Sequence, residues 1–104
     1  MQIGIVGLGR MGGNMARRLA RGGVEVIGFD ADAKASSVLA GERVLESASS
    51  IAALAHRLAA PRIVWLMVPA GRVTELAVEE VWPELSRGDV IVDGGNAKIG
   101  RAHV

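Results

Sequence analysis

Three glycines within six residues, directly after an apolar segment, constrain the fold of this chain more than any other feature. The apolar segment, residues 2–6, is typical of a short buried strand. Gly7, Gly9 and Gly12 follow it in the pattern G-x-G-x-x-G, and residues 10–21 then carry apolar side chains at helical spacing. A strand, a glycine turn and a helix in this order are the context in which the pattern indicates a binding loop for a phosphate-bearing ligand.

Strands and helices alternate along the rest of the chain. We expect strands at residues 2–6, 24–29, 63–68 and 90–93, and helices at 10–21, 33–40, 72–85 and from Ser49 or Ser50 to the residues before Pro61. Pro83 could end the helix at 72–85 early, and the segment 41–46 is ambiguous, with a short strand around Val44 as one interpretation. The apolar face of the first helix is expected to comprise Met11, Met15, Ala16 and Leu19, and that of the last Val73, Leu76, Ala77 and Val81.

This alternation predicts the fold class, because strands joined by helical crossovers form parallel sheets. We expect an α/β fold of the Rossmann type, with a doubly wound, mainly parallel sheet and helices on both faces. The predicted strand order is 3-2-1-4-5, with the glycine loop at the point where the order reverses. A length of 104 residues suffices for one such domain.

Composition excludes several classes of function. The formal net charge is +1, so there is no basic excess to neutralise a nucleic-acid backbone. The chain has no cysteine for a disulfide or a thiolate metal site, and His56 and His103 lack neighbours that suggest a metal site or a catalytic triad. The first apolar segment is too short for a signal peptide, and no segment reaches membrane-spanning length. We therefore expect a cytoplasmic protein without a metal, nucleic-acid or membrane partner.

Each glycine of the loop has its own expected role. Gly7 permits a tight turn out of the strand, Gly9 leaves room for a pyrophosphate to approach the backbone, and Gly12 lets the helix pack closely on the sheet. The unpaired N–H groups at the start of the helix, together with its positive dipole end, would face the anion. The alternative is a glycine-rich turn that binds no ligand.

A second feature of the same unit is the acidic residue that ends the second predicted strand. Asp30 lies 18 residues after Gly12, where an acid accepts hydrogen bonds from the hydroxyls of an adenosine ribose. It could instead be a surface acid or a helix cap, and Asp32 competes for the capping role. Arg10 could lean toward a phosphate, or it could be one of several solvated arginines of the helix.

Three segments together resemble the β-hydroxyacid dehydrogenase superfamily and, within it, decarboxylating 6-phosphogluconate dehydrogenase. They are Gly7-Leu8-Gly9-Arg10-Met11-Gly12, Met67-Val68-Pro69-Ala70-Gly71 and Asp93-Gly94-Gly95-Asn96, and the resemblance covers about residues 1–97. The first two also suit the 3-hydroxyisobutyrate dehydrogenase branch, which usually has Asp-Ser-Ser-Thr in place of the third. The third segment therefore favours the phosphogluconate branch.

The resemblance implies which residues contact a nicotinamide dinucleotide. Asp30 and the loop from Gly7 to Gly12, with Leu8, Arg10 and Met11, are expected to bind its adenosine and pyrophosphate. The family's loop that contacts a cofactor ribose corresponds to Met67, Val68, Pro69 and Ala70. Asn96 matches an asparagine that lies near the nicotinamide ribose and the sugar acid, so it is the one expected substrate contact.

Two departures from the family pattern concern the choice of cofactor. The long, NADP-using members carry Asn-Arg-Thr after the second strand, where this chain has Asp30-Ala31-Asp32, and their loop lysine is replaced by Pro69. Both changes remove favourable partners for a 2′-phosphate. The resemblance thus implies NAD as the preferred cofactor, with NADP possible.

The resemblance also implies an activity that this chain does not complete. The family oxidises and decarboxylates 6-phosphogluconate to ribulose 5-phosphate in the pentose phosphate pathway, with a lysine and a glutamate that lie well beyond residue 104. We expect a dinucleotide-binding domain at 1–97, no catalytic residue in this chain, and no helical substrate and dimer domain. The chain alone is expected to be inactive, and the full-length enzyme to be a homo-oligomer.

The last residues are expected to differ in kind from the rest. The family pattern is lost within a residue or two of Asn96, so we expect 98–104 to be a non-native tail on a truncated gene fragment. An ordinary divergent loop is the alternative. A stand-alone nucleotide-binding regulatory module of natural length remains a second class of function for the whole chain.

Overall fold

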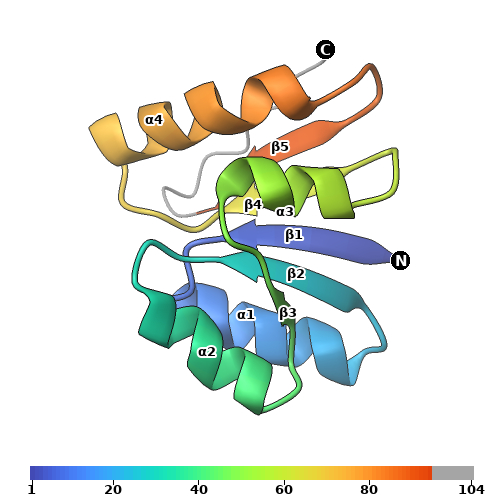
Figure 1. Ribbon diagram of the computed structural model, residues 1–104, viewed down its shortest axis with the longest axis vertical. Coiled ribbons are helices and arrows are strands. Elements are labelled where there is room, and N and C mark those ends of the chain that lie inside the picture. The colour runs from blue at the N-terminus through green and yellow to red at the C-terminus, as the bar shows by residue number, and fades with distance from the viewer. Residues whose placement is uncertain (95–104) are drawn as a thin grey trace.

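The computed structural model describes residues 1–94, which form a five-stranded, fully parallel sheet (Figure 1). The strands lie in the order β3-β2-β1-β4-β5. Their bounds are β1 (Gln2–Val6), β2 (Glu25–Phe29), β3 (Glu46–Ser47), β4 (Ile63–Leu66) and β5 (Val90–Asp93). The predicted fold class and strand order are confirmed.

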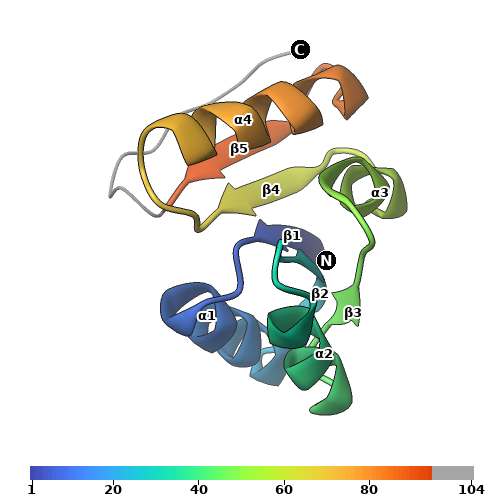
Figure 2. The same ribbon diagram turned by 60° about the vertical axis from the view of Figure 1, so that its left-hand side comes forward.

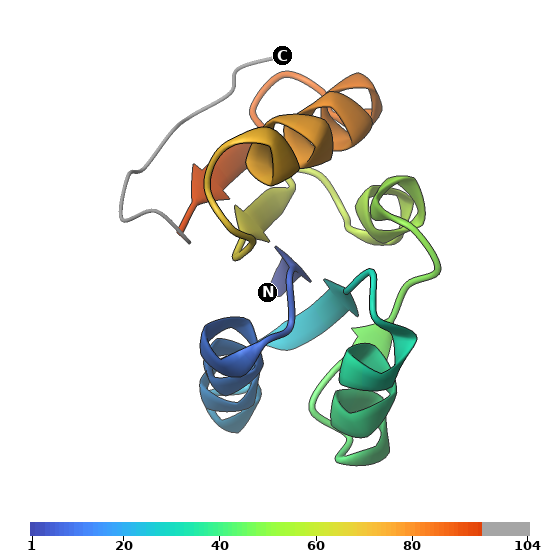
Figure 3. The same ribbon diagram turned by 90° about the vertical axis from the view of Figure 1, so that its left-hand side faces the viewer.

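The helices are divided between the two faces of this sheet. They are α1 (Arg10–Arg21), α2 (Ala33–Gly41), α3 (Ile51–Arg57), α4 (Arg72–Val81) and a short 3-10 helix, η1 (Trp82–Glu84). Figures 2 and 3 show α1 and α2 on one face and α3 and α4 on the other. The division follows from right-handed crossovers, because the chain runs toward one edge from β1 to β3 and toward the other edge from β3 to β5.

Two apolar clusters fill the space between the sheet and its helices. The cluster beneath α3 and α4 includes Ile27, Leu54, Val64, Leu66 and Val81, and the cluster beneath α1 and α2 includes Ile3, Ile5, Leu8, Ala16 and Leu39. In β4, Val64 and Leu66 join the first cluster, whereas Ile63 and Trp65 pack against the second. This alternation is the two-residue period of a strand buried on both faces.

Several predicted boundaries were wrong by a few residues. The short third strand is Glu46–Ser47 rather than a segment around Val44, and β4 ends at Leu66, so Met67 and Val68 lie in the loop after it. The last helix ends at Val81, and Pro83 lies in the 3-10 turn that follows. Proline lacks the N–H that a helix interior needs, which explains this early end.

Three side chains that were assigned to apolar helix faces are exposed. Met11 is 65% exposed, although Gly12 and Gly13 beside it in the first turns of α1 are buried, so its side chain is on the solvent side of the helix. Val73 and Leu76 are 48% and 45% exposed, although Ala77 and Val81 of the same helix are buried. The reason for the exposure of Val73 and Leu76 is the hollow that they border, described below.

Within residues 1–94, none of the helices has both the length and the apolar character needed to cross a membrane. The expected domain boundary at 97, the expected tail at 98–104 and Asn96 lie outside the described residues.

Candidate functional site

The loop between β1 and α1 is built so tightly that two of its glycines admit no side chain. Gly7 has φ +98°, and a Cβ there would lie 2.5 Å from the carbonyl oxygen of Met67. A Cβ on Gly12 would lie 1.9 Å from the carbonyl oxygen of Gly7. The first turn of α1 therefore rests directly on the backbone that leaves β1, and Met67, after β4, lies against the other side of Gly7.

Gly9 differs from its two neighbours, because space lies open around it. A Cβ at Gly9 would meet no atom within 4 Å, and its φ of −70° is one that any residue adopts. It is the N-cap of α1, where no side chain caps the helix and no acidic residue occupies the first turn. The N–H groups of a first helical turn have no partner within the helix, so this end offers donors and a positive dipole to an anion.

Asp30 connects the end of β2 to this glycine loop. One carboxylate oxygen accepts a hydrogen bond of 2.7 Å from the backbone N–H of Leu8, and the other accepts one of 2.8 Å from the N–H of Asp32. Asp32 in turn caps α2, because its side chain accepts a hydrogen bond from the N–H of Lys34 at 3.0 Å. Asp32 thus takes the capping role, and Asp30 holds the glycine loop against β2.

A pocket of about 450 Å³ opens beside Asp30, at the carboxyl ends of β1, β2 and β4. Its lining is mostly apolar and comprises Val6, Gly7, Phe29, Asp30, Ala31, Ile51, Val68, Pro69, Val73, Leu76, Ala77 and Glu80. Val73 and Leu76 are exposed because they form its wall on the α4 side. In an open parallel sheet, the crevice beyond the carboxyl ends of the strands, where the strand order reverses, is where ligands bind.

The structure brings most of the predicted site residues to this edge of the sheet. Gly7, Asp30, Val68 and Pro69 line the pocket itself. The buried Leu8 and the exposed Arg10 and Met11 belong to the loop and the first turn of α1. Met67 packs beside Gly7, whereas the exposed Ala70 lies outside the pocket lining.

Sequence reasoning missed the wall of the pocket that α4 provides. Val73, Leu76 and Glu80 were assigned to a core face or to none, yet all three border the pocket. Phe29, at the end of β2, and Ile51, at the start of α3, were also missed. The spacing of Val73, Leu76 and Glu80 in α4 was a usable signal, since positions i, i+3 and i+7 share one side of a helix.

A metal centre is not found among residues 1–94, where no three potential ligands cluster. His56, on α3, pairs with the carboxylate of Glu84 in η1.

The backbone geometry, the open space at Gly9 and the apolar pocket together define a Rossmann-type nucleotide-binding domain of the kind that dehydrogenases use.

Residues 2–103 match the NAD binding domain of 6-phosphogluconate dehydrogenase, and the chain belongs to this family. It is 42% identical over 97 residues to the NAD(+)-dependent, decarboxylating 6-phosphogluconate dehydrogenase of Haloferax volcanii, a match that covers 93% of this chain and 32% of the relative. The corresponding enzyme of Haemophilus ducreyi is 37% identical over 99 residues, covering 91% of this chain and 20% of the relative. The resemblance noted from the three segments is confirmed.

A solved structure shows the same fold. The 3-hydroxyisobutyrate dehydrogenase of Mycobacterium tuberculosis superimposes with a TM-score of 0.79 and 26% identity, over 88% of this chain and 30% of that chain. This chain spans between a fifth and a third of the length of the curated relatives named above.

Proposed function

We propose that this chain is the cofactor-binding part of an NAD-dependent, decarboxylating 6-phosphogluconate dehydrogenase. In this proposal the pyrophosphate of the dinucleotide lies over Gly9, the adenosine ribose lies at Asp30, and the adenine lies in the apolar pocket. The bound cofactor would supply the hydride acceptor for the oxidation. This chain's residues would hold and orient it, and groups beyond residue 104 would carry the acid–base chemistry.

The observation that carries the proposal is the open, uncapped start of α1 at Gly9. Gly7 and Gly12 are needed by the protein's own packing, but no contact within residues 1–94 would require glycine at position 9. An approaching anion would require it, because a side chain there would occupy the space in front of the helix N-terminus. Leu8 and Arg10 flank this point, and the arginine is available to a phosphate.

The same site favours NAD over NADP. The carboxylate of Asp30 can accept hydrogen bonds from ribose hydroxyls, but it would repel a 2′-phosphate of like charge. The residues that follow, Ala31 and Asp32, supply no cation, and Pro69 stands where the NADP-using relatives carry a lysine. Lys34 is the nearest cation in sequence, and it is exposed in the first turn of α2.

Titration calorimetry with NAD and NADP at one ionic strength tests both the site and the preference. We expect tighter binding of NAD by the wild-type chain and a smaller ratio of the two affinities for Asp30→Asn, which removes the charge. Tighter binding of NADP, or an unchanged ratio in Asp30→Asn, would show that Asp30 does not set the choice.

The substrate part of the proposal rests on sequence similarity. Asp93-Gly94-Gly95-Asn96 has the form found in the phosphogluconate branch, and the two relatives named above are 6-phosphogluconate dehydrogenases. We propose that Asn96 contacts the sugar acid and the nicotinamide ribose in the longer enzyme. A 3-hydroxyisobutyrate-type acid is the alternative, favoured by the fold shared with that dehydrogenase.

A further inference from the structure

The acidic side chains of α4 and η1 are not equivalent. Glu75 and Glu79 both pair with Arg72, and Glu84 pairs with His56 of α3. Among the described residues, Glu80 takes part in no ion pair, and its side chain makes no hydrogen bond. The carboxylate of Glu80 is therefore available to a ligand, and the place of Glu80 in the fold indicates which ligand group it would contact.

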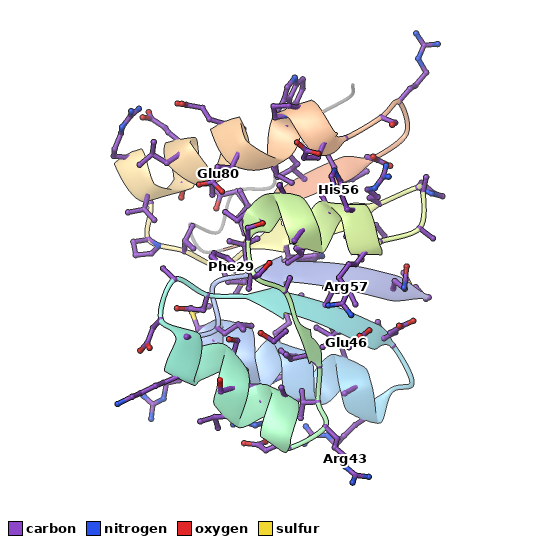
Figure 4. All side chains as sticks on the ribbon, viewed as in Figure 1. Phe29, Arg43, Glu46, His56, Arg57 and Glu80 are labelled. Atoms are coloured by element: carbon purple, nitrogen blue, oxygen red, sulfur yellow. The ribbon has the colours of Figure 1, made fainter. Side chains whose placement is uncertain are left out.

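Glu80 lies on the wall of the pocket beside Asp30. Val73, Leu76, Ala77 and Glu80 occupy helical positions i, i+3, i+4 and i+7, so they form one side of α4, and all four line the pocket. Figure 4 shows Glu80 on the side of α4 that faces α3. Phe29, which also lines the pocket, is the last residue of β2.

Asp30 and Glu80 are the two ionisable side chains of an otherwise apolar lining. They come from different elements: Asp30 follows β2 next to the glycine loop, and Glu80 belongs to the second half of α4. A nucleoside with its ribose at Asp30 would extend its base over Val68, Val73 and Leu76. The sugar would then lie at one carboxylate, and an edge of the base would lie in the part of the pocket that Glu80 borders.

We propose that Glu80 is a specificity-determining residue that selects adenine by accepting a hydrogen bond from its exocyclic amino group. An ionised carboxylate is an acceptor only. The amino group is the hydrogen-bond donor of the N9-substituted adenine ring system. In hypoxanthine a carbonyl oxygen, an acceptor, takes its place, and the donor is the neighbouring N1–H, which points in a different direction. The remaining lining residues offer the base apolar contacts, which do not distinguish the two. The inference rests on the proposed dinucleotide function and adds the group that reads the base.

Calorimetry with NAD and nicotinamide hypoxanthine dinucleotide tests this selection. We expect the wild-type chain to bind NAD about five- to tenfold more tightly than the hypoxanthine dinucleotide. A difference of this size corresponds to one hydrogen bond to the adenine amino group, which the hypoxanthine carbonyl cannot make with the carboxylate. In Glu80→Gln the side chain keeps its size but can donate as well as accept, so the affinity ratio is expected to fall toward one. Glu80 is exposed, so the fold is expected to tolerate the change.

The matched control is Glu79→Gln, the same change of charge one residue earlier, at a side chain outside the pocket lining. It is expected to keep the wild-type ratio. Gly9→Val is expected to abolish measurable binding of both dinucleotides, because it acts on the pyrophosphate that they share. Equal affinity of the wild type for the two dinucleotides, or a wild-type ratio in Glu80→Gln, would overturn the role of Glu80 and leave the proposed function standing.

Two further outcomes separate the remaining explanations. If Glu80→Gln changes NADP affinity while the ratio of NAD to the hypoxanthine analogue stays constant, Glu80 acts through its charge alone and the inference is wrong. If the wild-type chain binds neither dinucleotide, the proposed function fails and the inference fails with it.

Discussion

At the scale of single residues, the three glycines of the loop are needed for different reasons. Gly7 requires both its positive φ and its lack of a side chain, because Met67 lies against it. Gly12 lacks a side chain because the backbone of Gly7 lies where a Cβ would project. Gly9 meets no such limit in the part of the chain that the structure describes. Substitutions at these positions should therefore separate binding from folding.

Gly9→Val is expected to abolish measurable dinucleotide binding while leaving the fold in place. The valine side chain would enter open space at the N-terminus of α1, so it would block the anion without a clash at its Cβ with any of the described residues. Because glycine is a better N-cap than valine, a loss of about 1 kcal/mol in unfolding free energy is expected. Calorimetry with NAD and urea unfolding measure the two effects.

Gly12→Ala provides the contrast, because its methyl group would lie 1.9 Å from the Gly7 carbonyl oxygen. Overpacking of this kind lowers the unfolding free energy by about 1–3 kcal/mol. Wild-type NAD affinity in Gly9→Val would place the pyrophosphate elsewhere, and unchanged stability in Gly12→Ala would contradict the close contact.

At the scale of elements, β4 and β5 are joined at their starts by a buried carboxylate. Asp89, which is 0% exposed, accepts hydrogen bonds from the N–H groups of Arg62 and Ser86 at 2.6 and 2.7 Å. It also pairs with the guanidinium of Arg62 at 3.0 Å. Burial by itself raises the pKa of Asp89, but these hydrogen bonds and the arginine charge together lower it below its ordinary value.

The lowered pKa of Asp89 predicts a loss of stability in acid. A carboxyl group whose pKa is lower in the folded state stabilises the fold above its unfolded pKa, and this contribution is lost as the pH falls through the folded pKa. We expect the unfolding free energy to decrease below about pH 4. Urea unfolding of the wild type and Asp89→Asn at pH 7 and pH 3 measures it. The variant should be less stable at pH 7 and less sensitive to acid, and an equal acid sensitivity of the two chains would contradict the prediction.

The elements themselves were predictable where periodicity was strong. The helix α1 followed from apolar side chains at helical spacing, and a strand at 63–68 followed from a continuous apolar segment, although β4 ends at Leu66. The alternation of strands and helices predicted the order of the strands in the sheet. The strand Glu46–Ser47 was not predictable in the same way, because two exposed residues carry no period and the strand exists through its pairing with β2. Periodicity also placed Val73 in the core, since spacing identifies an apolar side of a helix but not what covers it.

The site was predictable to a similar extent. The glycine pattern located the loop, and the spacing to Asp30 located the acid that follows β2. The bond from the Leu8 N–H to Asp30 and the wall that α4 contributes depend on the packing of elements distant in sequence. Such contacts have no local pattern, so the spacing of Val73, Leu76 and Glu80 along α4 showed that they share one side of the helix but not that this side borders a pocket.

At the scale of the whole molecule, the proposed ligand would bridge elements that lie on opposite faces of the sheet. The pocket lining draws on β1, β2, α3, α4 and the loop after β4. A dinucleotide bound there would contact the helical layers of both faces, α1 on one side and α4 on the other. Its binding should therefore oppose global unfolding rather than a local opening.

NAD is expected to raise the unfolding free energy by about 2.7 kcal/mol when its concentration is a hundredfold above Kd. For a domain of this size the thermal midpoint should rise by about 10–20 °C. Thermal unfolding followed by circular dichroism at increasing NAD concentrations measures the shift, and Gly9→Val serves as the variant that should show none. An unchanged midpoint of the wild type at saturating NAD would refute binding to the folded domain.

Changing the cofactor preference of this domain by one substitution is expected to be difficult. The carboxylate of Asp30 is at once the group proposed to meet the sugar and the acceptor of the Leu8 N–H. Replacing it with a residue that lacks a side-chain acceptor, such as an arginine that would pair with a 2′-phosphate, leaves that N–H without its acceptor and loosens the turn that would hold the pyrophosphate. An evolutionary or engineered route to NADP therefore has an order, in which a new acceptor for Leu8 precedes or accompanies the loss of the acid.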